Sequence, residues 1–237
     1  MIRQLSLSLL FGVIFSTTTN AGVTIDGTRI IFPSNAKSVN VQLRNGFNEP
    51  ALVQTWIDDG NAMEIPNGET IPFILNPSLT RIEAKKGQVI RIIPTNTTTL
   101  ATDRESLYWF NLLDIPPESP EFSNVDKVKF NVRTRIKMFY RPATLKIQPH
   151  QAYQSLKFSF PQPQKMMIDN PTPYFITITK IQEIQQTENL LNDAIVIPPY
   201  EKINVLLNKS LSSNTPFKYT IINDIGTPIA LSPQHIE

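Results

Sequence analysis

The stretch VKFNVRTRIKM, residues 128–138, alternates apolar and polar side chains along its whole length. The apolar residues recur at every second position, with one threonine among them: Val128, Phe130, Val132, Ile136 and Met138. Successive side chains of a β-strand point to opposite faces, so this period of two predicts a strand with one apolar and one charged face. A strand of these eleven residues would reach about 36 Å, whereas a usual strand of about 5–6 residues reaches about 17–20 Å. The core of one domain therefore need not cover the whole apolar stripe.

Two interpretations of this stripe are open from the pattern alone. In the first, the strand is central and its apolar face packs on its own sandwich, which is the commoner outcome for an alternating strand. In the second, only Ile136 and Met138 pack inside, while Val128, Phe130 and Val132 overhang and serve a partner. Exposed apolar edge strands recruit other chains. An added strand gains affinity from main-chain hydrogen bonds and specificity from alternate side chains.

Strand signals dominate the rest of the chain as well. Further short alternating or β-rich stretches lie at residues 38–43, 52–56, 89–93, 106–112, 175–181 and 217–222. Turn signals such as Asn45-Gly46 and Pro198-Pro199 separate them. Residues 181–191 are the only stretch with helical character, and a strand followed by a loop explains them equally well. Short strands at regular spacing predict antiparallel β-sandwiches.

The length of 237 residues fits one large or two modest domains, at roughly 100–200 residues per domain. A proline-rich stretch after the long strand places a linker at residues 144–150. The segments on either side, 22–143 and 151–237, are each close to the ~100 residues of an immunoglobulin-like sandwich. We therefore expect two all-β domains.

Residues 1–21 have the character of a secretory signal peptide. Met1-Ile2-Arg3 gives a positive start, Leu5 to Phe15 is apolar, and small or polar residues precede a cut after Ala21. The apolar run is too short to span a bilayer, although an uncleaved N-terminal anchor is the alternative. We expect a mature chain that begins at Gly22 and is soluble outside the cytoplasm.

The composition argues against several classes of function. A net charge of +2 does not point to a nucleic-acid partner. The chain has no cysteine and two histidines, and it lacks GxGxxG, phosphate-loop and GxSxG motifs. Asp58-Asp59 before Gly60 is typical of a turn. We expect a protein that is not an enzyme and needs neither metal nor cofactor.

Five segments, in this order, resemble the motifs of the periplasmic pilus-assembly (fimbrial) chaperones of the chaperone–usher pathway. They are GTRIIFP at 27–33, DRESLYWFN at 103–111 with IPP at 115–117, RIKMFYRP at 135–142, NPTPY at 170–174 and IND at 222–224. The resemblance implies two immunoglobulin-like domains set at an angle, with a cleft between them. It also implies a periplasmic location, with pilin subunits and an outer-membrane usher as partners. Independently of the resemblance, an exposed edge strand predicts self-association of the free protein through that strand.

The resemblance assigns roles to three sets of residues. Arg29 and Lys137 match the pair that anchors the C-terminal carboxylate of a subunit. Val128, Phe130 and Val132 match the donor residues that complete the subunit's fold, which is an established example of strand addition. Glu105, Arg141 and Asp224 match an ionic cluster between the domains.

Two other functions remain as alternatives. A secreted immunoglobulin-like adhesin or structural module accounts for the signal and the sandwiches but not for the pairing of Arg29 with Lys137. A hydrolase is disfavoured because neither His150 nor His235 has a visible catalytic context.

Overall fold

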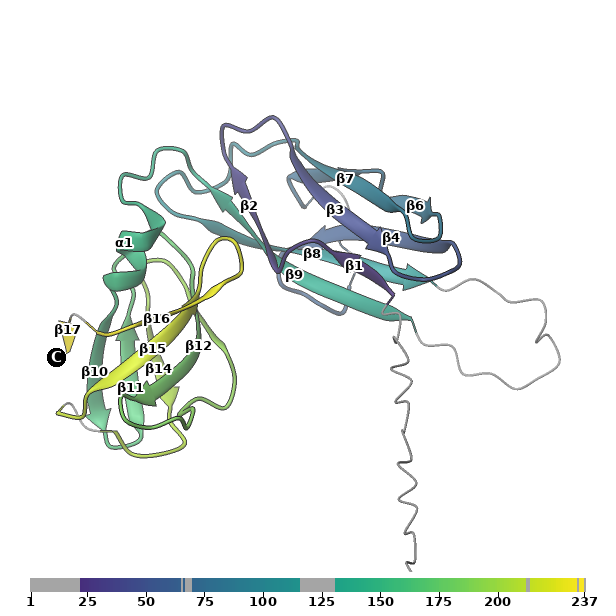
Figure 1. Cartoon of the computed structure of the whole chain (residues 1–237). Coiled ribbons are helices and arrows are strands. Elements are labelled where there is room, and N and C mark those ends of the chain that lie inside the picture. The colour runs from purple at the N-terminus through teal and green to yellow at the C-terminus, as the bar shows by residue number, and fades with distance from the viewer. Residues whose placement is uncertain are drawn as a thin grey trace, which may run out of the picture.

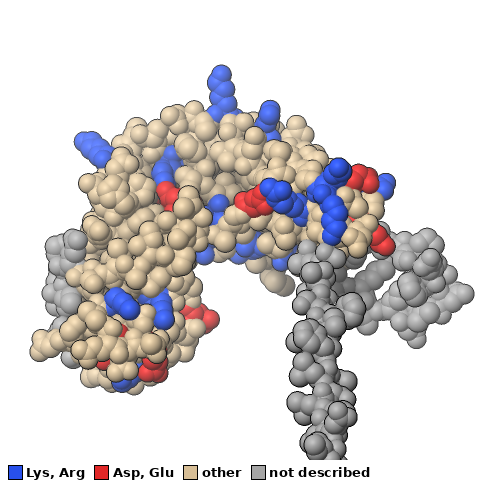
Figure 2. Space-filling model, in the orientation of Figure 1, with Lys and Arg blue, Asp and Glu red and all other residues tan. Residues whose placement is uncertain are grey.

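The computed structural model describes residues 22–64, 66, 70–115, 131–211, 214–233 and 235–236. Two β-sandwich domains lie at an angle to each other (Figure 1). Figure 2 shows that the surface is hollowed between them, with Lys and Arg side chains on the wall that the N-terminal domain contributes. Among the described residues, no helix has the length and apolar character needed to cross a membrane.

The N-terminal domain contains nine described strands in two sheets. They are β1 (Val23–Ile25), β2 (Arg29–Pro33), β3 (Val39–Asn45), β4 (Ala51–Asp58), β5 (Phe73–Asn76), β6 (Leu79–Ile82), β7 (Gly87–Pro94), β8 (Ser106–Ile115) and β9 (Val132–Arg141). One sheet has the order β1-β3-β7-β5, and the other has the order β2-β9-β8-β4-β6. The inward-facing side chains of both sheets meet in one core, whose fully buried members include Phe32, Leu43, Ile90, Phe110 and Met138.

The chain changes sheets between β1 and β2. β1 pairs antiparallel with β3, whereas β2 pairs in parallel with β9 in the opposite sheet. Gly27 lies in the connection with φ +118, a backbone conformation that favours glycine. β2 covers only residues 137–141 of β9. Within the described part of the chain, residues 132–136 pair with β8 alone, so their other edge is open.

The C-terminal domain is a second sandwich with its own core. It contains α1 (Pro149–Gln154), β10 (Lys157–Gln162), β11 (Lys165–Asp169), β12 (Ile176–Glu183), β13 (Ile195–Ile197), β14 (Lys202–Leu206), β15 (Phe217–Ile222), β16 (Pro228–Leu231) and β17 (His235–Ile236). The sheets have the orders β14-β11-β10-β17 and β13-β12-β15-β16. Phe158 packs edge-on to Phe217 at 5.2 Å and lies 5.0 Å from the ring of Tyr219. No disulfide is needed for this core, which is closed by aliphatic and aromatic side chains.

The helical expectation is resolved in favour of the strand and loop. Residues 176–183 form β12, and the chain then turns without a helix up to Leu191. The described helix, α1, instead begins at Pro149, inside the range that the sequence assigns to the linker. Proline at the first helical position has no N–H to leave unsatisfied, so a helix can begin there. A six-residue helix is too short for its periodicity to show in the sequence.

The Asn-Pro-Thr-Pro-Tyr motif at 170–174 builds a buried turn. Asn170 is fully buried, and its Nδ2 donates to the main-chain oxygens of Tyr174 at 2.7 Å and Pro198 at 2.9 Å. Its Oδ1 accepts hydrogen bonds from the N–H and the hydroxyl of Thr172. One asparagine side chain therefore satisfies main-chain groups of two loops, which explains why this motif holds a polar residue in an apolar domain.

Close main-chain and side-chain contacts join the two domains. The turn between β15 and β16 lies against the start of β2, so a Cβ added to Gly226 would lie 2.3 Å from Thr28 Oγ1. On another part of the junction, the Arg104 guanidinium lies 4.9 Å from the ring of Tyr200. The Glu105 N–H donates to Pro173 O at 2.9 Å. Contacts at several separate points restrict rotation of one domain against the other.

Candidate functional site

Arg29 of β2 and Lys137 of β9 are neighbours across the parallel pairing of these strands. Both side chains are half-buried. Burial lowers the pKa of Lys137, and the positive charges of Arg29 and Arg135 lower it further. Burial is also the main cause that lowers the pKa of Arg29. Two like charges that burial disfavours lie side by side, so an anion bound between them would stabilise both.

Neither cation of this pair forms an ion pair with a carboxylate among the described residues. Arg29 Nη1 donates to Ile222 O at 2.9 Å, but Arg29 Nε is buried without a hydrogen-bond partner there. Lys137 Nζ lies 5.0 Å from the centroid of the Trp109 ring. The pair thus keeps unused N–H donors and positive charge, which is the chemistry that recognises a carboxylate.

Val132 marks the point where the apolar stripe of β9 leaves the core. Met138 is fully buried and Ile136 packs against the core, whereas Val132 is 59% exposed. The predicted donor residues Val128 and Phe130 lie outside the described residues. In its described part, β9 therefore has an inner end that belongs to the domain and an outer end that offers an apolar side chain and an open edge.

Glu105, Arg141 and Asp224 lie together at the junction between the domains. Arg141 Nε donates to Glu105 Oε1 at 2.7 Å, and its two terminal nitrogens donate to Asp224 at 2.6 and 2.8 Å. Tyr153 donates its hydroxyl to Asp224 Oδ1 at 3.1 Å, and the Phe175 N–H donates to Glu105 Oε2 at 2.8 Å. The arginine therefore bridges a carboxylate of each domain, with a bidentate bond to the one on the β15–β16 turn.

The two carboxyl groups of this cluster shift in opposite directions. Burial raises the pKa of Glu105 and outweighs the attraction of Arg141. Burial also acts to raise the pKa of Asp224, but the hydrogen bonds and charge of Arg141, with the hydroxyl of Tyr153, outweigh it and the pKa is lowered. Asp224 is therefore the carboxylate whose charge the cluster stabilises most.

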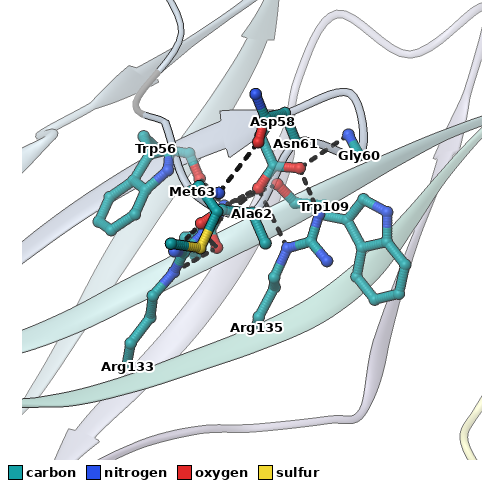
Figure 3. Close-up of polar contacts among 10 residues, drawn as sticks. Trp56, Asp58, Gly60, Asn61, Ala62, Met63, Trp109, Arg133 and Arg135 are labelled. Carbon is teal, nitrogen blue, oxygen red and sulfur yellow. Dashed lines mark hydrogen bonds and ion pairs between the residues drawn. The ribbon is translucent and has the colours of Figure 1, made fainter.

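Asp58, at the end of β4, is a buried acceptor that the sequence reading missed (Figure 3). Its side chain is fully buried and accepts from Arg135 Nε at 3.1 Å and Nη2 at 2.5 Å. Asn111 Nδ2 and the Gly60 N–H each donate to it at 2.8 Å. Burial acts to raise the pKa of Asp58, but these hydrogen bonds outweigh it and the pKa is lowered. The hydrogen bond from Gly60 belongs to the turn that the sequence predicts. The hydrogen bonds from Arg135 are an additional role that the sequence does not predict.

The charged face of β9 also stacks on two tryptophan rings. The Arg133 guanidinium lies 4.8 Å from the Trp56 ring, and that of Arg135 lies 4.0 Å from the Trp109 ring. Lys137 shares the ring of Trp109, so this indole contacts two cations of one strand. A cation over an aromatic face is attracted by the ring quadrupole. The charged face of β9 is thus held on its own domain, which leaves the open edge and the outer apolar end free.

The contacts of Asp58 with the arginines of β9 depend on the register of three strands. Arginines at alternate positions of β9 need acceptors on the neighbouring strands, and Asp58 follows a tryptophan by two positions on the same face of β4. Without the pairing of β4, β8 and β9, the sequence does not show that these residues share one face.

Comparison with known proteins finds the same architecture and sequence pattern. Residues 22–146 match the family model of the pili and flagellar-assembly chaperone, PapD N-terminal domain, and residues 151–232 match that of the pili assembly chaperone PapD, C-terminal domain. The chain belongs to the PapD family of pili-assembly chaperones.

Individual relatives in this family cover nearly the full chain. The probable fimbrial chaperone YadV of Escherichia coli is 38% identical over 224 residues, which are 91% of this chain and 90% of YadV. The chaperone protein HifB of Haemophilus influenzae is 37% identical over 223 residues, 92% of this chain and 90% of HifB. The crystal structure of the Pseudomonas aeruginosa CupB2 chaperone has a TM-score of 0.75 at 30% identity and covers 90% of this chain and 100% of CupB2. The expected all-β fold of two immunoglobulin-like domains is confirmed.

Proposed function

We propose that this protein binds fimbrial subunits in the periplasm by lending them the outer part of β9, and that it delivers them to an outer-membrane usher. The observation that carries this proposal is the open edge at residues 132–136, which continues directly into the cation pair Arg29 and Lys137. An added strand could use the edge for main-chain hydrogen bonds and the pair for its terminal carboxylate. The curated relatives are named as fimbrial chaperones, which supports this assignment.

The carboxylate anchor follows from the unmet chemistry of the pair. Arg29 offers a planar donor fork with a buried free N–H, and Lys137 adds a point charge beside it. A hydrogen bond to a charged group contributes about 1.5–3 kcal/mol. Fixing one end of the added strand also fixes its register, because a slip by one residue would turn every side chain to the other face.

The donor residues proposed for the subunit groove are Val128, Phe130 and Val132. Val132 supports the proposal because its side chain is exposed although it continues the stripe of the buried Met138. A subunit that lacks a strand of its own would cover this side chain and complete its core with it. The bulk of Phe130 would restrict which subunit pockets accept the strand.

The cluster of Glu105, Arg141 and Asp224 is proposed to hold the angle between the domains. A partly buried ionic network of this kind gives orientation more readily than net stability. The domain limits proposed here are 22–143 and 151–237, with the linker at 144–150, and residues 1–21 are proposed as a cleaved export signal.

The family is a family of chaperones and not of enzymes, and we propose that this member has no catalytic activity. The alternative of a secreted adhesin is not favoured, because an adhesin gives no role to an anion site next to an open strand edge. We also propose that the free protein can pair with a second copy through the same edge.

Co-expression with candidate fimbrial subunits, followed by mass spectrometry of what co-purifies, tests the function. Wild-type protein should retain subunits, and Lys137→Ala should lose them while its thermal unfolding stays cooperative. Lys146→Ala is the matched control, because Lys146 is exposed and lies outside the pair. Equal retention of subunits by Lys137→Ala and wild type would exclude the anchor, and retention of none by the wild type would exclude the function.

A further inference from the structure

Asp114 near the end of β8 is a buried carboxylate, and only one of its two oxygens is hydrogen-bonded within the described residues. It lies on the same face of β8 as the core residues Phe110 and Leu112, and it is 4% exposed. Its Oδ2 accepts the N–H of Val23 at 3.1 Å. Its Oδ1 is buried and has no hydrogen-bond partner within the described ranges. A buried charged oxygen without a donor is costly, so a cation or donor placed at this oxygen would stabilise it.

No Lys or Arg side chain of the described chain supplies that cation through an ion pair to Asp114. The residue next to the carboxylate is Gly22. A Cβ placed on Gly22 would lie 2.7 Å from Asp114 Oδ2 and 3.6 Å from the ring of Phe47. The nitrogen of Gly22 is two bonds away from that Cβ position, so it lies at most about 5 Å from the same oxygen.

The position of Gly22 is fixed by main-chain contacts. Its carbonyl oxygen accepts the N–H of Gly46 at 3.2 Å, and the next residue, Val23, begins the pairing of β1 with β3 opposite Asn45. A larger residue at this position would force the Asp114 carboxylate to shift, while the Phe47 ring would lie at ordinary contact distance. The nitrogen of Gly22 is therefore held near a buried carboxylate while the peptide bond to Ala21 is still intact.

We propose that the Ala21–Gly22 bond is the processing site of the export signal, and that Asp114 binds the α-ammonium group that cleavage creates on Gly22. This proposal rests on the export of the chain that is part of the proposed function. Hydrolysis adds water across the peptide bond: the hydroxyl joins the carbonyl carbon of Ala21 and a proton joins the nitrogen of Gly22. An α-amino group has a pKa of about 7.7–8.0, so it is mainly protonated at neutral pH and carries three donors. The N-terminal family match also begins at residue 22.

The position of this pair links processing to the proposed donor strand. Asp114 is the Cα partner of Val132 in the pairing of β8 with β9. An ion pair at Asp114 would fasten the first residue of the mature chain beside the outer end of β9. Only the processed chain has the ammonium, so the precursor would lack this contact.

Four proteins test the ion pair: a chain that begins at Gly22, a chain with one serine before Gly22, and Asp114→Asn in each. The serine keeps a terminal ammonium but moves it away from the carboxylate by one residue, about 3.8 Å between Cα atoms. In the chain that begins at Gly22, Asp114→Asn should lower the melting temperature by at least about 3 °C, which is within reach of one ion pair in a chain of this size. In the extended chain the same substitution should cost less than half as much.

An equal loss of melting temperature in both backgrounds would overturn the ion pair. The comparison of the two wild-type chains is a second measurement that needs no variant at Asp114: the chain that begins at Gly22 should melt higher than the extended one. Equal melting temperatures for these two would also overturn it. Intact mass of the exported wild type tests the processing site separately, and a mature chain that begins anywhere other than Gly22 would overturn that part.

These measurements do not use a subunit, so a failure to capture subunits would count against the proposed function and leave the ion pair standing. Conversely, normal capture by a protein whose melting temperature does not depend on its first residue would retain the function and exclude the ion pair.

Discussion

Arg29, on β2 of the N-terminal domain, donates a hydrogen bond of 2.9 Å to the main-chain oxygen of Ile222, on β15 of the C-terminal domain. The same arginine is the partner of Lys137 across β2 and β9. The proposed carboxylate site and the junction between the domains therefore share one side chain. Lys137 has no comparable contact with the C-terminal domain among the described residues, and this difference can be measured.

Arg29→Ala and Lys137→Ala should both weaken subunit binding by roughly 10- to 100-fold, because each would remove a charge-assisted bond to the proposed subunit carboxylate. Only Arg29→Ala should also change the arrangement of the domains, seen as a broader distance distribution in small-angle X-ray scattering. A scattering curve for Lys137→Ala that differs from wild type as much as that of Arg29→Ala would contradict this division of roles.

Val132→Glu should leave stability nearly unchanged and weaken subunit binding. Val132 is 59% exposed, and exposed substitutions usually stay within about 0.5 kcal/mol. The introduced carboxylate would have to enter an apolar groove of the subunit, which is unfavourable. Val132→Ile is the matched control and should bind normally. Met138→Ala, on the same stripe but fully buried, should instead lower the free energy of unfolding by about 2–5 kcal/mol.

Unchanged subunit binding by Val132→Glu would show that this side chain does not enter the groove. Binding and thermal unfolding should be measured on the same preparations, since a loss of both would place Val132 in the core of the domain.

Asp58→Asn should destabilise the N-terminal domain by about 1–3 kcal/mol at neutral pH, because Arg135 would lose a charged acceptor in a buried setting. The effect should depend on pH with a defined sign. The pKa of Asp58 is lowered in the folded protein, so the stabilisation is present above its unfolded pKa of about 3.9 and is lost as the pH falls through the lower folded value. The difference in melting temperature between wild type and Asp58→Asn should therefore be constant from pH 7 to 5 and shrink below pH 4.

A difference that grows as the pH falls below 4 would contradict the lowered pKa. Asp59→Asn is the control for the loss of a negative charge in the same turn, since Asp59 is exposed.

Gly226→Ala should disturb the junction between the domains more than Gly60→Ala disturbs its own turn. Both glycines have positive φ values, +84 and +130, so alanine is strained at either position. The added Cβ would lie 2.3 Å from Thr28 Oγ1 at Gly226, whereas nothing lies within 4 Å of it at Gly60. Thermal unfolding and small-angle scattering should show a shared loss of stability, with a change of domain arrangement in Gly226→Ala alone. A double variant with Thr28→Gly should recover the arrangement.

The fold class was predictable because the strands of both sandwiches show apolar–polar alternation over a few neighbouring residues. The strand predicted at 217–222 is β15, and the one predicted at 52–56 lies within β4. Along these strands, buried positions alternate with less buried ones, and this pattern is visible over six or seven residues. Helix α1 was missed because its six residues are too few to show a helical period.

The site was predictable only in part, for a physical reason. Motifs mark residues that are close in the chain, such as Arg135 and Lys137, but partners across strands depend on register. The contact of Asp58 with Arg135 joins residues 77 positions apart, and that of Arg29 with Ile222 joins residues 193 apart. The resemblance to fimbrial chaperones singled out Arg29, Lys137 and the ionic cluster, whereas nothing in the motifs pointed to Asp58 or to Asp114.

The change of sheets between β1 and β2 has a further consequence for any strand that pairs with β9. β2 occupies the edge from Lys137 onward, so an incoming chain must stop there, and the cation pair lies at that stopping point. The five open residues from 132 to 136 then span about 17 Å. With the proposed carboxylate site at that point, a partner strand would be positioned from its own last residue. Which of its side chains face the protein would then depend on their distance from that terminus. Adding a single residue to the end of a partner would exchange its inward and outward side chains, so the length of the tail would matter as much as its composition.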